Sequence, residues 1–176
     1  MLWSRARVES RTGTTGHPFG GEDLTMRIRR FRRGDAVAAS QIISRCFLTM
    51  DVGGNSPEGV QLQLEHNTPQ ELIARAETGA FFVAADGGEV IGIGGYGEGM
   101  VRTVFVEPDH HRHGIGTRIM KRVLSEARKN REYHLECWST HVAEPFYAKL
   151  GFKRDDIVEF PTVSFVRMTL DLAENA

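Results

Sequence analysis

The sequence has few cysteines, no long apolar run and almost no net charge, and the first two shortages exclude classes of protein. Its 176 residues include 2 cysteines, Cys46 and Cys137, both in apolar surroundings. So few cysteines cannot form a disulfide framework, and we expect two buried thiols in a reducing compartment. No run approaches the roughly 20 apolar residues of a membrane span, and no apolar signal core is present, so we expect a cytoplasmic protein without a membrane partner.

The net charge of -1 hides an uneven distribution of charge. The first 33 residues carry a surplus of arginine, and the remainder is acidic. A basic arm can bind nucleic acid, but this one is short and its basic run includes a single aromatic residue, Phe31, so we expect no nucleic-acid partner. Residues 4–23 are rich in Ser, Thr, Gly and Arg and cannot bury enough apolar surface to fold. We therefore expect an N-terminal extension, residues 1–25, and one domain, residues 26–176.

Hydrophobic periodicity predicts an alternation of strands and helices. Asp35 and Thr68 are expected to cap two of the helices, and residues 50–56 form a glycine-rich loop. The order of elements predicts one mixed α/β (α+β) domain. The expected strands are 27–31, 81–85, 89–97, 100–106, 133–139, 157–160 and 163–170, and the expected helices are 35–47, 57–64, 69–76, 114–130 and 142–150.

Residues 111–117 (HRHGIGT) join an expected strand to the longest expected helix. Gly114 and Gly116 allow the backbone to approach a ligand closely, and the first N–H groups of a helix attract anions. The segment predicts a pyrophosphate-binding loop, with a purely structural turn as the alternative. Its charged or chargeable members are His111, Arg112 and His113.

Two further patterns are assigned no ligand. Gly92–Gly97 (GIGGYG) matches the dinucleotide fingerprint, but a strand rather than a helix follows it, so we expect these glycines to serve close backbone packing. Asp109–His113 contains several metal-ligand types, but neighbouring residues rarely converge on one ion. We therefore expect no metal site.

Two motifs together resemble the GNAT acyltransferase superfamily. The first is Val104-Phe105-Val106-Glu107-Pro108 leading into Gly114-Ile115-Gly116, and the second, about 30 residues later, is Ala143-x-x-Phe146-Tyr147-x-x-x-Gly151-Phe152. The resemblance covers residues 26–172. It implies the GNAT fold, a mixed central sheet of about six to seven strands flanked by helices, with splayed fourth and fifth strands.

The resemblance implies that the chain moves an acetyl group from its co-substrate acetyl-CoA to a primary amine, by direct attack in a ternary complex. The pantetheine arm would lie between the splayed strands, bonded by backbone groups of Val104 and Val106. Residues 111–117 would hold the pyrophosphate, although the family usually has Gln or Arg where His111 stands. The implied cofactor-binding residues are Val104, Phe105, Val106, His111, Arg112, His113, Gly114, Ile115, Gly116 and Thr117.

Tyr147 matches the family's general acid, which would protonate the departing thiolate. Glu98, at the entry to the fourth strand, is the first candidate for the general base. Glu136, on the fifth strand, is the second, and either can instead be a solvated carboxylate. Thr140 stands where the family commonly carries Asn, and its hydroxyl is expected to cap the following helix.

The family chooses its acceptor through segments that correspond here to residues 50–77 and to the hairpin between the last two strands. Asp51, Asn55, Glu58 and Glu65 would attract a cationic amine. A small-molecule amine, a peptide N-terminus and a protein lysine all stay open as acceptors, and the resemblance allows a homodimer. The alternative function is a non-catalytic acyl-CoA-binding or regulatory module of the same fold.

Overall fold

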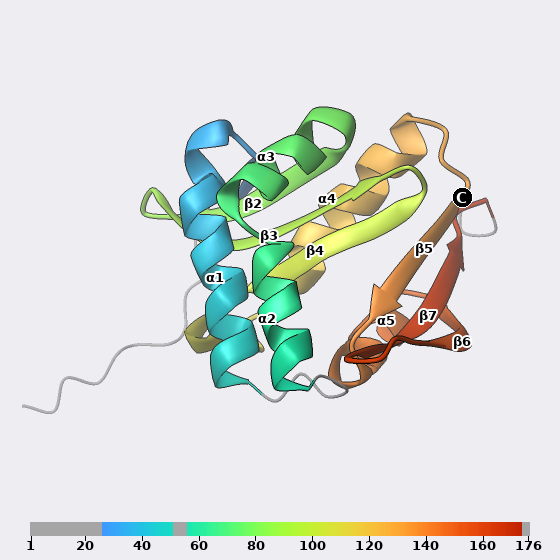
Figure 1. Ribbon diagram of the computed structural model, residues 1–176. Helices are drawn as coiled ribbons and strands as arrows, with labels where there is room; N and C mark the ends of the chain where they lie inside the picture. Colours follow the sequence, from blue (N-terminus) through green and yellow to red (C-terminus); the bar gives the residue numbers. More distant parts are fainter. Residues whose placement is uncertain (1–25, 51–55, 174–176) are drawn as a thin grey trace, which may run out of the picture.

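The strands of the computed structural model, which describes residues 26–50 and 56–173, form one sheet in the order β1-β2-β3-β4-β5-β7-β6 (Figure 1). The sheet confirms the predicted mixed α/β fold. The strands are β1 (Arg27–Arg30), β2 (Ala80–Asp86), β3 (Glu89–Gly97), β4 (Met100–Val106), β5 (His134–Ser139), β6 (Lys153–Glu159) and β7 (Ser164–Asp171). The α-helices are α1 (Ala36–Thr49), α2 (Pro57–Glu65), α3 (Pro69–Thr78), α4 (Ile115–Lys129) and α5 (Glu144–Lys149).

Helices cover both faces of the sheet (Figure 1). On one face, α1 and α3 bury Ile43, Phe47 and Leu72 against β2 and β3. On the other face, the apolar side of α4 packs with residues of α5, β5 and β7 in a larger core. Each side of the sheet therefore has its own core, and side chains that alternate along a strand enter different cores.

β4 and β5 are parallel, and they pair only at Met100 with Glu136 and at Val101 with Cys137. The next part of β4 contains a bulge, because its register with β3 shifts between Ile93 and Gly95. Thr103 lies in this bulge with a φ of 60°. A bulge bends and twists its strand, which accounts for the divergence of β4 from β5 seen in Figure 1. The predicted splay of the fourth and fifth strands is confirmed.

Helix starts follow the predicted capping in part. The Thr68 hydroxyl accepts a hydrogen bond from the Glu71 N–H at 3.3 Å, as predicted. Asp35 is the N-cap residue of α1, as predicted, but its side chain does not cap the helix, because its carboxylate accepts two bonds from the Arg29 guanidinium, at 2.7 and 2.8 Å. Thr140 likewise forms no side-chain cap, because a 3-10 turn, His141–Ala143, precedes α5.

Other boundaries were also predicted incompletely. β6 begins at Lys153, before the expected residue 157, because its charged first residues form an edge strand that pairs with β7.

Gly92–Gly97 lies inside β3 with no helix after it, so the expectation of close packing is confirmed: a Cβ at Gly95 would lie 2.4 Å from the Phe81 ring. Most of the predicted loop 50–56, with Asp51 and Asn55, lies outside the described residues, as does the expected extension.

Candidate functional site

The edge of β4 that faces β5 carries free backbone groups. The Glu107 N–H donates to the Ile91 carbonyl of β3 at 2.9 Å. Because backbone groups alternate along a strand, those of Phe105 also face β3, whereas those of Val104 and Val106 face β5. The β4–β5 pairing ends before this point, at Val101. Val104 and Val106 therefore line an edge inside the sheet that β5 leaves unpaired.

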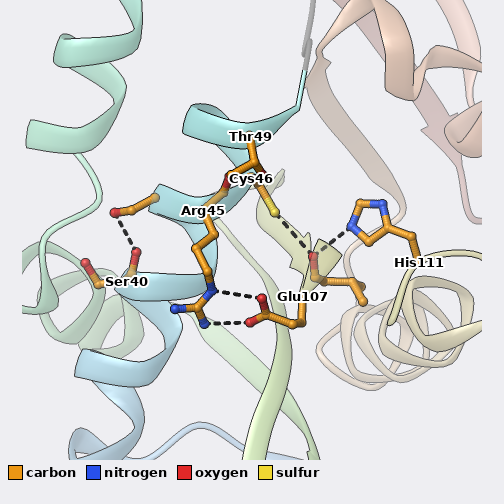
Figure 2. Close-up of polar contacts among 8 residues, drawn as sticks. Ser40, Arg45, Cys46, Thr49, Glu107 and His111 are labelled. Carbon is orange, nitrogen blue, oxygen red and sulfur yellow. Dashed lines mark hydrogen bonds and ion pairs between the residues drawn. The ribbon is translucent and has the colours of Figure 1, made fainter. Parts of the chain in front are cut away.

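One group on this edge is already engaged by side chains (Figure 2). The Val106 carbonyl lies 2.8 Å from His111 Nε2 and accepts a hydrogen bond from Cys46 Sγ at 3.2 Å. The neighbouring Glu107 carboxylate accepts two bonds from Arg45, at 2.8 and 2.6 Å. These contacts attach the end of α1 to the end of β4. They leave the Val106 N–H and both backbone groups of Val104 on the open edge.

The segment after β4 forms a loop that presents helix N–H groups. Arg112 and Gly114 have φ values of 64° and 76°, and Gly114 is the residue that precedes α4. Apart from its two chain neighbours, no residue comes within 4 Å of a Cβ placed at Gly114, and the first turn of α4 has no acidic side chain. The N–H groups that begin a helix lack partners within it and carry partial positive charge. The loop therefore fits an anion such as a pyrophosphate.

Tyr147 lies on α5, in the core that also contains Cys137 of the last β4–β5 pair. Its side chain is only 8% exposed, and its ring packs edge-on against Phe146 and Phe152, at centroid distances of 5.1 and 5.5 Å. The Phe146 ring also lies 3.4 Å from the Cβ position of Gly116, so α5 packs against the start of α4. Burial raises the pKa of Tyr147, and nearby Cys137 raises it further. The phenol is therefore neutral.

The two candidate bases occupy different surroundings. Glu98 lies in the turn before β4 with a φ of 52°; its side chain is 80% exposed and lies 3.8 Å from Arg102. Glu136 is partly buried, faces Met100 in the ladder and accepts a hydrogen bond from the Trp138 indole. Only Glu136 is placed directly beside the point where β4 and β5 separate.

The two segments expected to choose the acceptor touch each other. The Ser56 N–H donates to the Thr162 carbonyl at 3.0 Å, and a Cβ at Gly59 would lie 2.2 Å from that oxygen. A shallow hollow of about 410 Å³ lies between Ser56 and residues 159–164, and another, of about 390 Å³, lies on α2 beside Glu58 and Glu65. The two segments thus meet where Ser56 and Gly59 contact Thr162.

Both cysteines are buried and free, as predicted. Burial raises the pKa of Cys46 to about 11 and that of Cys137 to about 12. Within residues 26–50 and 56–173, no helix is long and apolar enough to cross a membrane, and no three His, Cys, Asp or Glu side chains are placed to hold a metal ion.

Comparison with known families identifies this arrangement. The model of an acetyltransferase (GNAT) domain family matches residues 52–172, more than half of the chain. The chain belongs to the GNAT acetyltransferase family. Family membership establishes acyl transfer as the reaction class and acetyl-CoA as the co-substrate that the family uses. No curated protein sequence matches this GNAT chain.

Solved structures share the fold. A GCN5-related N-acetyltransferase from Rhodopseudomonas palustris is 18% identical with a TM-score of 0.77, covering 89% of this chain and 100% of its own. The PaiA N-acetyltransferase from Thermoplasma acidophilum, in complex with coenzyme A, is 17% identical with a TM-score of 0.70, covering 84% and 99%. YncA from Salmonella typhimurium, with its cofactor acetyl-CoA, is 22% identical with a TM-score of 0.62, covering 84% and 94%.

Two groups of side chains near the separation of β4 and β5 in this GNAT fold were not predicted from the sequence. Arg75 of α3 donates to Thr103 Oγ1 at 3.1 Å, beside the bulge of β4. Trp138, Phe160 and Phe165 form an aromatic cluster beside Glu136, with centroids 5.8 to 6.4 Å apart. Both groups depend on contacts between distant segments, and neither forms a local motif.

Proposed function

We propose that this GNAT chain is an N-acetyltransferase that moves the acetyl group of acetyl-CoA to a primary amine by direct attack in a ternary complex. The observation that carries the proposal is the position of Tyr147. It belongs to the same buried core as Cys137, a member of the last β4–β5 pair, where the free edge of β4 begins. A thioester bound along that edge would reach Tyr147 at its inner end.

Backbone groups supply most of the proposed cofactor site. The Val104 N–H and carbonyl and the Val106 N–H would bond the pantetheine amides, with Phe105 keeping β4 attached to β3. The pyrophosphate would lie on the N–H groups of Ile115, Gly116 and Thr117, in a loop that carries Arg112 and His113. His111 acts indirectly, because its ring is held by the Val106 carbonyl.

The proposed role of Tyr147 is to donate a hydrogen bond to the sulfur as the carbon–sulfur bond breaks. A free thiol has a pKa of about 8.5, below that of a phenol, and burial raises the pKa of Tyr147 further. Complete proton transfer from Tyr147 to the thiolate is therefore unfavourable. The neutral phenol instead stabilises the charge that develops on sulfur.

Glu136 is the better placed of the two bases. The buried β5 residues Leu135 and Cys137 face the core that contains Tyr147, so Glu136 between them faces the opposite side of the sheet. An amine that approaches from the Glu136 side would lose a proton to the carboxylate as the nitrogen–carbon bond forms. Tyr147 would meet the departing sulfur from the other side.

A screen of primary amines with acetyl-CoA tests the proposal. We expect thiol release with at least one amine, and mass spectrometry should identify the acetylated amine. Calorimetric titration with coenzyme A provides the control. If coenzyme A binds but no amine is acetylated, the chain is the non-catalytic acyl-CoA-binding module of the same fold.

A further inference from the structure

Two arginines from different elements lie together where β4 leaves β5. Arg75 Nη1 donates to Thr103 Oγ1 at 3.1 Å, and Arg102 is the neighbouring residue on β4. Val101 and Val104 pack into the core beneath α4, so the bulge between them directs Arg102 and Thr103 to the face covered by α3. Arg75 and Arg102 therefore share one side of the sheet.

The positive charge of Arg75 has no anionic hydrogen-bond partner among the residues that the structure describes. Its guanidinium donates to Asn67 Oδ1 at 2.9 Å, to Thr103 Oγ1 and to the His66 carbonyl, all of them neutral acceptors. Burial lowers the pKa of Arg75, and the charge of Arg102 lowers it further, while Glu71 acts in the opposite direction. The site thus holds a partly buried cation beside a second one.

Arg102 is also incompletely satisfied. Its Nε is buried and has no hydrogen-bond partner within the described part of the chain. Its ion pair is with Glu98, at 3.8 Å, and the Glu98 side chain is 80% exposed, so solvent weakens the attraction. Two neighbouring guanidinium groups with donors to spare favour an anion, and the planar geometry of guanidinium matches a carboxylate.

The position of this pair separates it from the anion loop. Arg102 lies four residues before the end of β4, about 13 Å along a strand, whereas the loop follows that end. The pair is instead close to the last β4–β5 pairs, on the same side of the sheet as Glu136. An anion bound here would therefore belong to the acceptor rather than to the pyrophosphate.

We propose that Arg75 and Arg102 bind a carboxylate of the acceptor, so that the acceptor is an amine that also carries a carboxylate, of the amino-acid class. This inference rests on the proposed acetyl transfer. It also means that Glu58 and Glu65 of α2 do not alone determine which acceptor binds. The charged groups nearest the proposed reaction centre on the acceptor side include two arginines, Arg75 and Arg102.

The test compares three forms of each acceptor: an L-amino acid, its carboxamide and the amine without the carboxyl group. Phenylalanine, methionine and alanine serve as the parent amino acids. The carboxylate forms should have the highest kcat/KM, by about tenfold or more, as for a hydrogen-bonded charged group. Arg102→Gln should remove this preference and leave the rate with the simple amine within about threefold. Arg33→Gln, an exposed arginine paired with Glu77, should change nothing.

A binding measurement keeps the inference separate from the proposed function. Calorimetry with the same amino acids, in the presence of coenzyme A, should show binding to the wild-type chain and at least tenfold weaker binding to Arg102→Gln. Equal activity with all three forms, or amino-acid binding that is absent or unaffected by Arg102→Gln, would overturn the carboxylate site. Acetyl transfer to simple amines but not to amino acids would overturn the carboxylate site and would leave the proposed acetyltransferase function intact.

Discussion

The Nε2 of His111 donates a hydrogen bond of 2.8 Å to the carbonyl oxygen of Val106, the last residue of β4. A carbonyl oxygen can only accept, so this nitrogen carries a hydrogen. The ring therefore supports the junction between β4 and the anion loop. The backbone, rather than this side chain, is left to meet the pyrophosphate.

This contact predicts that His111→Gln is tolerated better than His111→Ala. The Gln amide can donate to the same carbonyl, whereas Ala leaves it with Cys46 alone. We expect the KM for acetyl-CoA to stay within about threefold for His111→Gln and to rise about fivefold or more for His111→Ala, as for a lost hydrogen bond. Steady-state kinetics at saturating amine measure this, and equal effects of the two variants would contradict it.

Tyr147→Phe should lower kcat about 100-fold, because it removes the donor that stabilises charge on sulfur. The KM for acetyl-CoA should change little, since the aromatic ring and its contacts with Phe146 and Phe152 remain. Tyr133→Phe is the matched control, because Tyr133 is 61% exposed. Full turnover by Tyr147→Phe would exclude the residue from the mechanism.

Glu136→Gln and Glu98→Gln distinguish the two candidate bases. We expect Glu136→Gln to lower kcat by about 100-fold or more, because the amide cannot accept the proton of the amine. Glu98→Gln should retain kcat within about threefold, because its carboxylate is largely solvated. The opposite ranking would assign the base to Glu98.

Gly95→Ala should lower the free energy of unfolding by about 1–3 kcal/mol, the usual cost of overpacking. The added methyl would lie 2.4 Å from the Phe81 ring and 2.8 Å from the Ala80 carbonyl. Gly34→Ala is the control, since no atom beyond its two chain neighbours lies within 4 Å of its Cβ position. Urea unfolding of the two variants measures the difference, which would be absent if this glycine were not packed.

Asp35→Asn should destabilise the fold by about 1–3 kcal/mol at pH 7, because it removes hydrogen bonds to a charged partner. Burial alone would raise the pKa of Asp35, but hydrogen bonds from the Arg29 side chain and the Arg32 N–H outweigh it and hold the pKa below its ordinary 3.8. The stabilisation is therefore present above about pH 3.8 and is lost as pH falls further.

Unfolding measured across this pH range should show the wild type and Asp35→Asn converging in acid. Glu77→Gln, which breaks an exposed pair with Arg33, should cost less than about 0.5 kcal/mol at any pH. A constant difference between wild type and Asp35→Asn down to pH 2 would contradict the assignment.

Periodicity and motif spacing predicted most of the fold because α4 and the central strands carry strong patterns. The start of β6 has no such pattern: Lys153 to Asp156 are all charged, and only pairing with β7 makes them a strand. The position of Tyr147 followed from its motif. Arg75 and Arg102 could not be paired from the sequence, because their proximity depends on the bulge at Thr103 and on how α3 crosses the sheet.

The short β4–β5 ladder also divides the sheet into two parts that few backbone hydrogen bonds connect. Among the described residues, the first four strands join the last three through two residue pairs and the Glu136 N–H bond to the Gly99 carbonyl. Opening this junction breaks few backbone hydrogen bonds, although both halves also pack in the core beneath α4, so amide hydrogen exchange should report two units of the sheet with different rates. A ligand that bonds both free edges would couple these units and slow exchange on either side. Binding of the ligand would then be detected as slower amide hydrogen exchange across the whole sheet.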